Sequence, residues 1–214
     1  MECQQQRVIS RERAPLVHHY KCSFDFRSVP DIRQHIIGLL SSSMVHKRRH
    51  EANESYAVVT LPSVSNCTFM IFHSGFVNVS ALRKHSVALE TGETLRKALG
   101  LAGPAPPCQI DNMTASGQLC IRSDEYLDLD KLCERAKRNS YEASVEFVRF
   151  NVERFPGCQI RTRSWGTINC FSSGKWVGVG VKGFENLAKL RHLIRHIVTH
   201  SDCISRSTFG ERKD

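Results

Sequence analysis

Three histidines, His192, His196 and His200, recur at every fourth residue near the end of the chain. On a helix this spacing aligns the imidazoles along one face, where they could bind zinc if further ligands completed the coordination. The sequence offers no fourth ligand or acidic partner close to them. A solvated helix face produces the same spacing without a metal, so a polar or basic face that includes Lys189 is favoured over a metal site. We expect no cofactor.

The nine cysteines are scattered, and none of them forms a C-x-x-C pair, so the sequence supports neither a zinc ribbon nor a thioredoxin-type site. Several lie inside apolar runs, as Cys120 and Cys170 do, which predicts reduced thiols that serve as small core residues. The sequence contains no phosphate-binding loop, nucleophile elbow, zinc-protease motif or dinucleotide fingerprint. Composition alone leaves cysteine–histidine catalysis open, but no arrangement of residues points to it. We therefore expect a protein that is not an enzyme.

The chain carries 30 Lys and Arg against 21 Asp and Glu, a net charge of +9 with a pI near 9.3. An excess of this size favours an anionic partner: nucleic acid first, then an acidic protein or a membrane surface. A soluble basic protein without such a partner is the alternative. No apolar run is long enough to span a membrane, and the polar segment Met1–Pro15 does not resemble a secretory signal. We expect an intracellular protein without a small-molecule substrate.

A Gly- and Pro-rich stretch, Gly100–Pro107, divides the chain into two similar halves and is typical of a linker. The segment 69–75 aligns with 168–174, and Phe72 aligns with Phe171 at an offset of 171 − 72 = 99 residues. The same offset pairs Tyr56 with Phe155, Ser74 with Ser173 and Gly75 with Gly174. An offset that persists over several landmarks indicates an internal duplication.

Both halves follow the same order of predicted elements. A strand comes first, at 17–26 in the first half and at 109–121 in the second. An amphipathic helix follows, and its apolar stripe is Val29, Ile32, Ile36 and Leu40 in the first half and Leu129, Leu132 and Ala136 in the second. Short strands follow at 56–61, 67–72, 158–162 and 167–171, and after a turn at Ser173-Gly174 the last of them continues through Val181. Each half ends in a longer helix at about 87–99 or 183–200. Helices that pack on one face of an antiparallel sheet leave the other face open to solvent or to a ligand.

Several segments resemble those of the TATA-binding protein family. They are the inter-repeat segment from Leu99 to Met113, the loop Glu153-Arg-Phe-Pro-Gly157, and the hairpin Phe171–Lys182. Over residues 15–200 the chain is thereby identified as a divergent member of that family. The resemblance implies an α+β fold: a pseudo-symmetric two-repeat saddle whose curved antiparallel sheet carries its helices on the convex face. The implied organisation is a flexible start at 1–14, repeats at 15–99 and 109–200, a linker at 100–108 and a flexible tail at 201–214.

The resemblance also implies a function, which is to bind and bend promoter DNA from the minor groove. The implied protein partners are general transcription initiation factors and the RNA polymerase machinery, and the implied location is the nucleus if the source is eukaryotic. Aromatic residues of such a protein wedge between base steps, an asparagine reads the minor groove, and polar or basic residues contact phosphates. The corresponding DNA-binding residues here are Tyr56, Phe72, Ser74, Ser80, Asn112, Phe155, Arg161, Phe171, Ser173, Lys175, Val177 and Val179. Partner contacts are implied for Glu153, Lys189, Arg191 and Arg195. Burial of the aromatic residues in the core and ordinary solvation of the polar ones are the alternatives.

The first half departs from the family pattern at Phe76, where lysine is usual, at Asn78, where valine is usual, and at Pro62, where a phosphate-binding arginine is usual. His19 replaces the first-half asparagine, and Asn169-Cys170 replaces an apolar pair in the second half. The second half is therefore expected to bind DNA more like the family than the first. Two alternatives stay open: an interaction protein of this fold with weak or lost sequence-specific DNA binding, and a DNA-repair enzyme on a similar scaffold.

Overall fold

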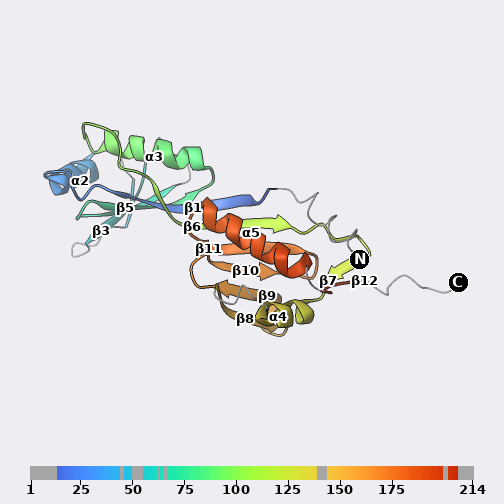
Figure 1. Ribbon diagram of the computed structural model, residues 1–214. Helices are drawn as coiled ribbons and strands as arrows, with labels where there is room; N and C mark the ends of the chain where they lie inside the picture. The colour runs from blue at the N-terminus through green and yellow to red at the C-terminus, as the bar shows by residue number, and fades with distance from the viewer. Residues whose placement is uncertain are drawn as a thin grey trace. The chain divides into compact units, whose positions relative to one another are not determined.

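The computed structural model describes residues 14–43, 46–49, 55–61, 63–64, 67–138, 144–199 and 202–206. The chain forms two compact units: residues 19–112 make the first, and residues up to 18 together with those from 113 onward make the second (Figure 1). The expected flexible start at 1–14 lies outside the described residues apart from Ala14, as do Pro62 and His200. In the described part of the chain, no helix is both long and apolar enough to span a membrane.

The sheet of the first unit runs in the order β2–β3–β4–β5–β1, and every neighbouring pair is antiparallel. Helix α3 packs against β5. The elements are β1 (Leu16–Asp25), α2 (Ile32–Ser41), β2 (His46–Arg49), β3 (Tyr56–Thr60), β4 (Thr68–Phe72), β5 (Phe76–Leu82) and α3 (His85–Ala98).

The sheet of the second unit runs in the order β6–β11–β10–β9–β8, again antiparallel. Helix α4 packs on β8 and β9, and α5 packs on β10 and β11, so both helices lie on one face of this sheet. A short strand pair, β7 with β12, stands apart from it. The elements are β6 (Gln109–Gln118), β7 (Glu125–Leu127), α4 (Leu129–Arg138), β8 (Val145–Asn151), β9 (Phe155–Thr162), β10 (Thr167–Cys170), β11 (Lys175–Val181), α5 (Phe184–Thr199) and β12 (Ile204–Arg206).

The predicted duplication is visible in the bounds of the elements. Strand β5 (Phe76–Leu82) and strand β11 (Lys175–Val181) differ by 175 − 76 = 99 residues at both ends, and β4 and β10 begin 167 − 68 = 99 residues apart. Backbone geometry repeats as well, since Gly75 and Gly174 both have positive φ in the turns before these strands. Ala81 and Gly180, 99 residues apart, have φ values of +70° and +71° and lie at matching irregularities of β5 and β11.

The offset of 99 residues fails at one predicted pair, Tyr56 with Phe155. Tyr56 lies directly opposite Phe72 in the β3–β4 ladder. The β9–β10 ladder ends with the pair Cys158 and Cys170, and one residue further on Gly157, not Phe155, lies opposite Phe171. The second repeat is thus shifted by two residues at this strand. Gly157 allows the shift, because a Cβ there would come within 2.7 Å of the Phe155 ring.

A large buried ring packs against a glycine in both units, but the ring and the glycine lie on different elements in each. In the first unit the buried ring of Phe24 packs against Gly92, where an added Cβ would lie 2.5 Å from the ring. In the second unit the buried indole of Trp176 occupies the space above Gly117, where a Cβ would lie 2.4 Å from it. A large ring next to a glycine keeps each interior close-packed.

Three predictions of local structure need correction. Helix α2 begins at Ile32, so Val29 is not part of its stripe: Pro30 precedes the start, and Asp31 is left-handed at φ +53°. The linker 100–108 is tied to α3, because the Ala105 amide donates to Glu93 at 2.9 Å and the Arg96 side chain donates to the Leu101 carbonyl. Residues 204–206 of the expected flexible tail form β12, anchored by the buried Cys203.

Candidate nucleic-acid interface

Each sheet has one face covered by core and one open face, and alternation along the strands decides which side chains reach the open one. Ala57, Val59, Phe69 and Ile71 are fully buried, whereas the residues between them are half-buried. The half-buried or exposed set of the first unit is Tyr56, Val58, Thr60, Thr68, Met70, Phe72, Phe76, Asn78 and Ser80. The corresponding set of the second unit is Phe155, Gln159, Arg161, Thr167, Asn169, Phe171, Lys175, Val177 and Val179.

The structure brings the four predicted wedge residues together in two pairs, one in each unit. The ring centroids of Tyr56 and Phe72 lie 5.4 Å apart, and those of Phe155 and Phe171 lie 5.8 Å apart, both in tilted arrangements. All four are half-buried, so none belongs to the buried core. Two adjacent rings that are partly exposed provide the rigid apolar surface that insertion between base steps requires.

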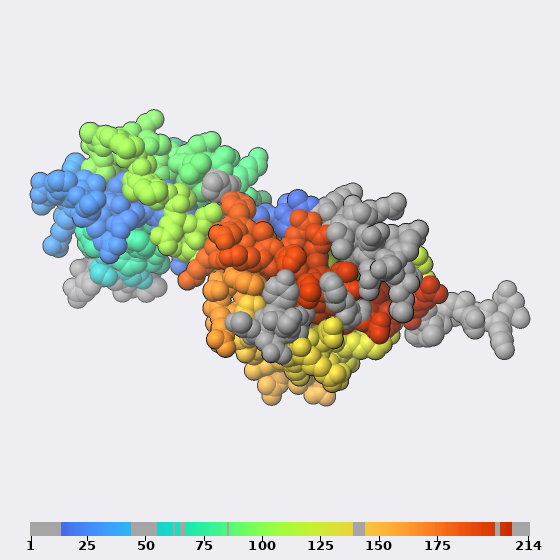
Figure 2. All heavy atoms as spheres, in the orientation of Figure 1, coloured from blue at the N-terminus to red at the C-terminus, as the bar shows by residue number. Residues whose placement is uncertain are grey.

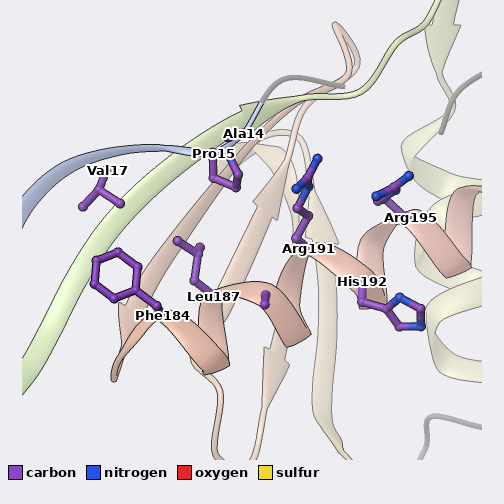
Figure 3. Close-up of a pocket in the computed structure, with 9 residues that line it drawn as sticks. Ala14, Pro15, Val17, Phe184, Leu187, Arg191, His192 and Arg195 are labelled. Atoms are coloured by element: carbon purple, nitrogen blue, oxygen red, sulfur yellow. The ribbon is translucent and has the colours of Figure 1, made fainter. Parts of the chain in front are cut away.

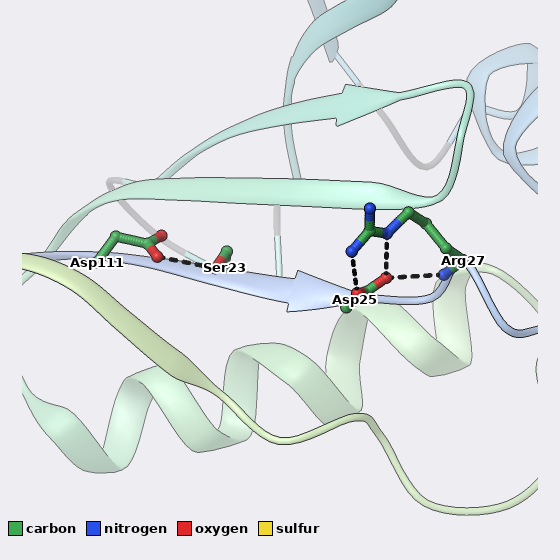
Figure 4. Close-up of polar contacts among 4 residues, drawn as sticks. All are labelled: Ser23, Asp25, Arg27 and Asp111. Carbon is green, nitrogen blue, oxygen red and sulfur yellow. Dashed lines mark hydrogen bonds and ion pairs between the residues drawn. The ribbon is translucent and has the colours of Figure 1, made fainter.

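The first unit has a third aromatic residue beside its pair. Phe76 lies 6.2 Å from Phe72, and the Arg27 guanidinium lies over the Phe76 ring at 5.6 Å from its centroid. Asp25 holds Arg27 in place, accepting hydrogen bonds from its Nη2 at 2.6 Å, its Nε at 2.9 Å and its backbone amide at 3.0 Å (Figure 4). These hydrogen bonds lower the pKa of Asp25 to about 2. Arg27 thus supplies a cation beside the position where the family has lysine and this chain has Phe76.

The predicted phosphate-contact residues of the second unit differ in their surroundings. Lys175 is exposed, and its amide donates to the exposed Ser173 hydroxyl at 3.4 Å. Arg161 is exposed too, but its Nε donates to Glu146 Oε2 at 2.9 Å. Glu146 lies on β8, a strand that the sequence pattern did not reveal. A phosphate would therefore compete with a carboxylate for this arginine.

Strand β8 adds further side chains that sequence analysis missed. Arg149 pairs with Gln159 in the β8–β9 ladder, Gln159 pairs with Asn169, and Asn169 pairs with Val177. Because paired residues of antiparallel strands share a face, these four side chains form one row across the open face. The Gln159 amide donates to Asn169 Oδ1 at 3.3 Å, and the Arg149 guanidinium lies 5.7 Å from the Phe147 ring centroid. We call Arg149, Gln159, Asn169 and Val177 the amide row.

The remaining predicted DNA-binding residues are exposed or half-buried. Asn112 and His19 are both exposed. Each precedes a buried residue, Met113 or Tyr20, and these two hold equivalent ladder positions opposite Val181 and Leu82. His19 is therefore the counterpart of Asn112, as expected. Next to Asn112, Asp111 accepts a hydrogen bond from Ser23 at 3.1 Å (Figure 4). Ser74 and Ser80 are exposed, and Val177 and Val179 are half-buried.

The predicted partner-binding residues fall in two places. Glu153 is exposed in the turn between β8 and β9, where its amide donates to Asn151 Oδ1 at 3.1 Å. The other three lie on α5, whose side chains form part of the surface seen in Figure 2. Lys189 pairs with Glu185 at 2.6 Å and lowers the pKa of that carboxyl group. Arg191 and Arg195 line a groove of about 430 Å³ together with Phe184, Leu187 and Val17 (Figure 3).

The described part of the chain contains no metal-ligand cluster and no disulfide. Among the described residues, no cluster of three or more His, Cys, Asp or Glu side chains could hold a metal ion. None of the eight described cysteines takes part in a disulfide, and six of them are buried, as Cys158 and Cys170 are. Burial is the main cause of the raised pKa of both these thiols, which makes them poor nucleophiles at neutral pH.

The fold has a counterpart among solved structures. The TATA-binding protein (TBP) of Methanococcus jannaschii is 20% identical and superposes with a TM-score of 0.61, and the match covers 87% of this chain and 98% of that one. The chain has the fold of the TATA-binding proteins. This finding confirms the resemblance at the level of the fold, and with it the predicted fold class, the α+β two-repeat saddle.

The other comparisons add no functional information. A heterotetrameric sarcosine oxidase from Corynebacterium sp. U-96 is 10% identical at a TM-score of 0.26, over 86% of this chain and 80% of that one. A likeness this low carries no argument. No protein-family model matches the chain, and no curated protein matches it.

Proposed function

We propose that this protein binds duplex DNA from the minor groove with the open faces of its sheets, bends the DNA and acts in transcription initiation. The proposal rests chiefly on the two half-buried aromatic pairs, Tyr56 with Phe72 and Phe155 with Phe171, each at one end of an open face. Support also comes from the TBP fold and from the net charge of +9. The proposed function is a binding function, without catalysis.

The aromatic pairs have the physical properties of wedges. Partial unstacking of a base step costs a few kcal/mol, and an inserted ring offsets part of this cost by replacing the lost stacking. Bending then brings more protein surface into the groove. Phe155 and Phe171 suit full insertion because both rings are apolar, whereas the Tyr56 hydroxyl must stay hydrated or find a partner. We therefore expect a sharper kink at the end of the DNA held by the second unit.

The test measures bending by energy transfer between dyes at the two ends of a short duplex. Wild-type protein at saturation should shorten the end-to-end distance, Phe155→Ala should reduce both the bend and the affinity, and Tyr56→Phe should leave both intact. Tyr56→Phe serves as the matched control, because it alters a wedge residue without removing its ring. Straight DNA in the saturated wild-type complex would refute the bending mechanism.

One observation favours a second candidate, an interaction protein of this fold that has lost DNA binding. Arg161, a predicted phosphate contact, is paired with Glu146, and Phe76 occupies the equivalent of the exposed Lys175. The first feature offsets the charge of a predicted phosphate contact, and the second puts an aromatic ring in place of a lysine, with Arg27 as the cation beside it. The absence of any salt-dependent binding to duplex DNA would favour this candidate over the first, since phosphate contacts release counterions.

Transcription initiation factors are the proposed protein partners, and the nucleus the proposed location if the source is eukaryotic. In the second unit, α5 offers an apolar floor with Arg191 and Arg195 at its rim, and Glu153 offers an acidic contact on a different element. Opposite charges at separate places suit more than one partner.

A further inference from the structure

We propose that the amide row of the second unit recognises the exocyclic amine of guanine, so that the half-site it contacts accepts or prefers G·C pairs. The inference rests on the proposed minor-groove binding and adds a base preference to it. It starts from the hydrogen bond between the Gln159 and Asn169 side chains in the middle of the open face.

This hydrogen bond determines what the two amides offer outward. Gln159 donates through Nε2 to Asn169 Oδ1 at 3.3 Å. Each amide has one acceptor oxygen and one NH₂ group, so Gln159 Oε1 and Asn169 Nδ2 remain for a ligand. Neither side chain makes another hydrogen bond to a described residue, and both are half-buried. The pair thus presents an acceptor and a donor side by side.

A donor next to an acceptor matches a G·C pair better than an A·T pair. In the minor groove, A·T and T·A display only the acceptors adenine N3 and thymine O2, whereas G·C adds the guanine N2 amine as a donor. Gln159 Oε1 can accept from that amine while Asn169 Nδ2 donates to guanine N3 or cytosine O2. At an A·T pair, Gln159 Oε1 faces only acceptors and loses its hydration without gaining a partner.

The first unit provides a natural comparison within the same chain. Its equivalent row contains Val58 opposite Met70, and Met70 opposite Asn78. Val58 and Met70 therefore replace Gln159 and Asn169 in register. At these two positions the first unit has apolar side chains, which cannot satisfy the guanine amine, and its amide Asn78 lies one strand further along, where the second unit has Val177. The base pair that contacts Val58 and Met70 should therefore not favour G·C over inosine·C. The two halves of the bound DNA are expected to differ in base preference.

Arg149 lies at one end of the amide row, opposite Gln159 on the edge strand β8. It is exposed, and Phe147 supports its guanidinium at 5.7 Å. An arginine beside the amides can contact the phosphate that flanks the base pair and so fix the register of the DNA on the sheet, while the amides distinguish the base.

The experiment changes single chemical groups on the DNA. A series of A·T-rich duplexes carries one G·C pair at each position in turn, and a matched series carries inosine·C at the same positions. Inosine lacks only the N2 amine, so the affinity ratio between the two series isolates recognition of that amine. At one or two neighbouring positions in one half of the site, wild type should bind G·C about tenfold more tightly than inosine·C.

The double variant Gln159→Val/Asn169→Met, which places the side chains of Val58 and Met70 at the equivalent positions of the second unit, should bring the affinity ratio between G·C and inosine·C duplexes to about one at every position. Thr167→Val is the matched control, because it removes one hydroxyl from the same face of β10 outside the amide row; it should leave the preference unchanged. A wild-type ratio of one at every position, with A·T-only duplexes still bound, would overturn the amide proposal alone. Failure of wild type to bind any duplex would overturn the proposed function together with it.

Discussion

Ala81 and Gly180 allow the duplication to be tested by stability, independently of any ligand. The two residues lie 99 positions apart with φ values of +70° and +71°. A left-handed conformation costs an alanine about 1–2 kcal/mol relative to glycine. Glycine loses about 0.5–1 kcal/mol more backbone entropy on folding. Ala81→Gly should therefore stabilise the first unit by about 0.5–1 kcal/mol, the difference between these two effects.

Gly180→Ala should produce a change of the same size and opposite sign in the second unit. No atom lies within 4 Å of the Cβ that the substitution adds, so backbone strain is its only local effect. In urea denaturation with a slope of about 2 kcal/mol per molar, either change corresponds to about 0.3–0.5 M in the midpoint.

The assay can distinguish the two units. Both tryptophans of the chain, Trp165 and Trp176, belong to the second unit, so their fluorescence follows that unit, while far-ultraviolet circular dichroism follows both. Ala188→Gly on the exposed face of α5 is the control, because glycine in an ordinary helical conformation should destabilise by about 1 kcal/mol. A lowered midpoint for Ala81→Gly, as for the control, would refute the left-handed conformation of Ala81.

Two further predictions concern the second unit. Arg161→Ala should weaken binding to all duplexes about equally and reduce the slope of log affinity against log salt by about 1. Glu146→Gln should strengthen binding and steepen the slope by up to about 1. Unchanged slopes in a filter-binding titration would remove Arg161 from the interface. Gly117→Ala should lower stability to urea by about 1–3 kcal/mol through overpacking against Trp176. Its control, Gly178→Ala on the neighbouring strand, adds a Cβ at an ordinary 3.5 Å contact and should be tolerated.

The duplication could be predicted from the sequence because it left local marks. A turn that needs positive φ retains its glycine, which is why Gly75 and Gly174 are visible as a pair. Strand alternation then placed β4, β10 and β11 within a few residues of their observed bounds, whereas no strand was predicted at β5.

The β9 register and strand β8 could not be predicted in the same way. Register depends on how rings and backbone fit across the sheet, and the space that Gly157 leaves for the Phe155 ring has no signature in one sequence. Strand β8 has two bulges in its pairing with β9, which interrupt the alternation of buried and exposed residues along it. Arg149 and Glu146 were missed for this reason.

Placing the two repeats in register shows that their open faces differ in chemistry at several equivalent positions. The first unit carries Met70 and Phe76 where the second carries Asn169 and Lys175. Substitutions of this kind leave the buried face untouched, since alternate residues of each strand hold the core. The fold can therefore be kept while the open faces change position by position. Polar side chains are lost as well as gained, since Asn78 and Ser80 of the first unit stand where the second carries Val177 and Val179. On a ligand with two different halves, this asymmetry would fix which half each repeat contacts, a choice that two identical repeats could not make.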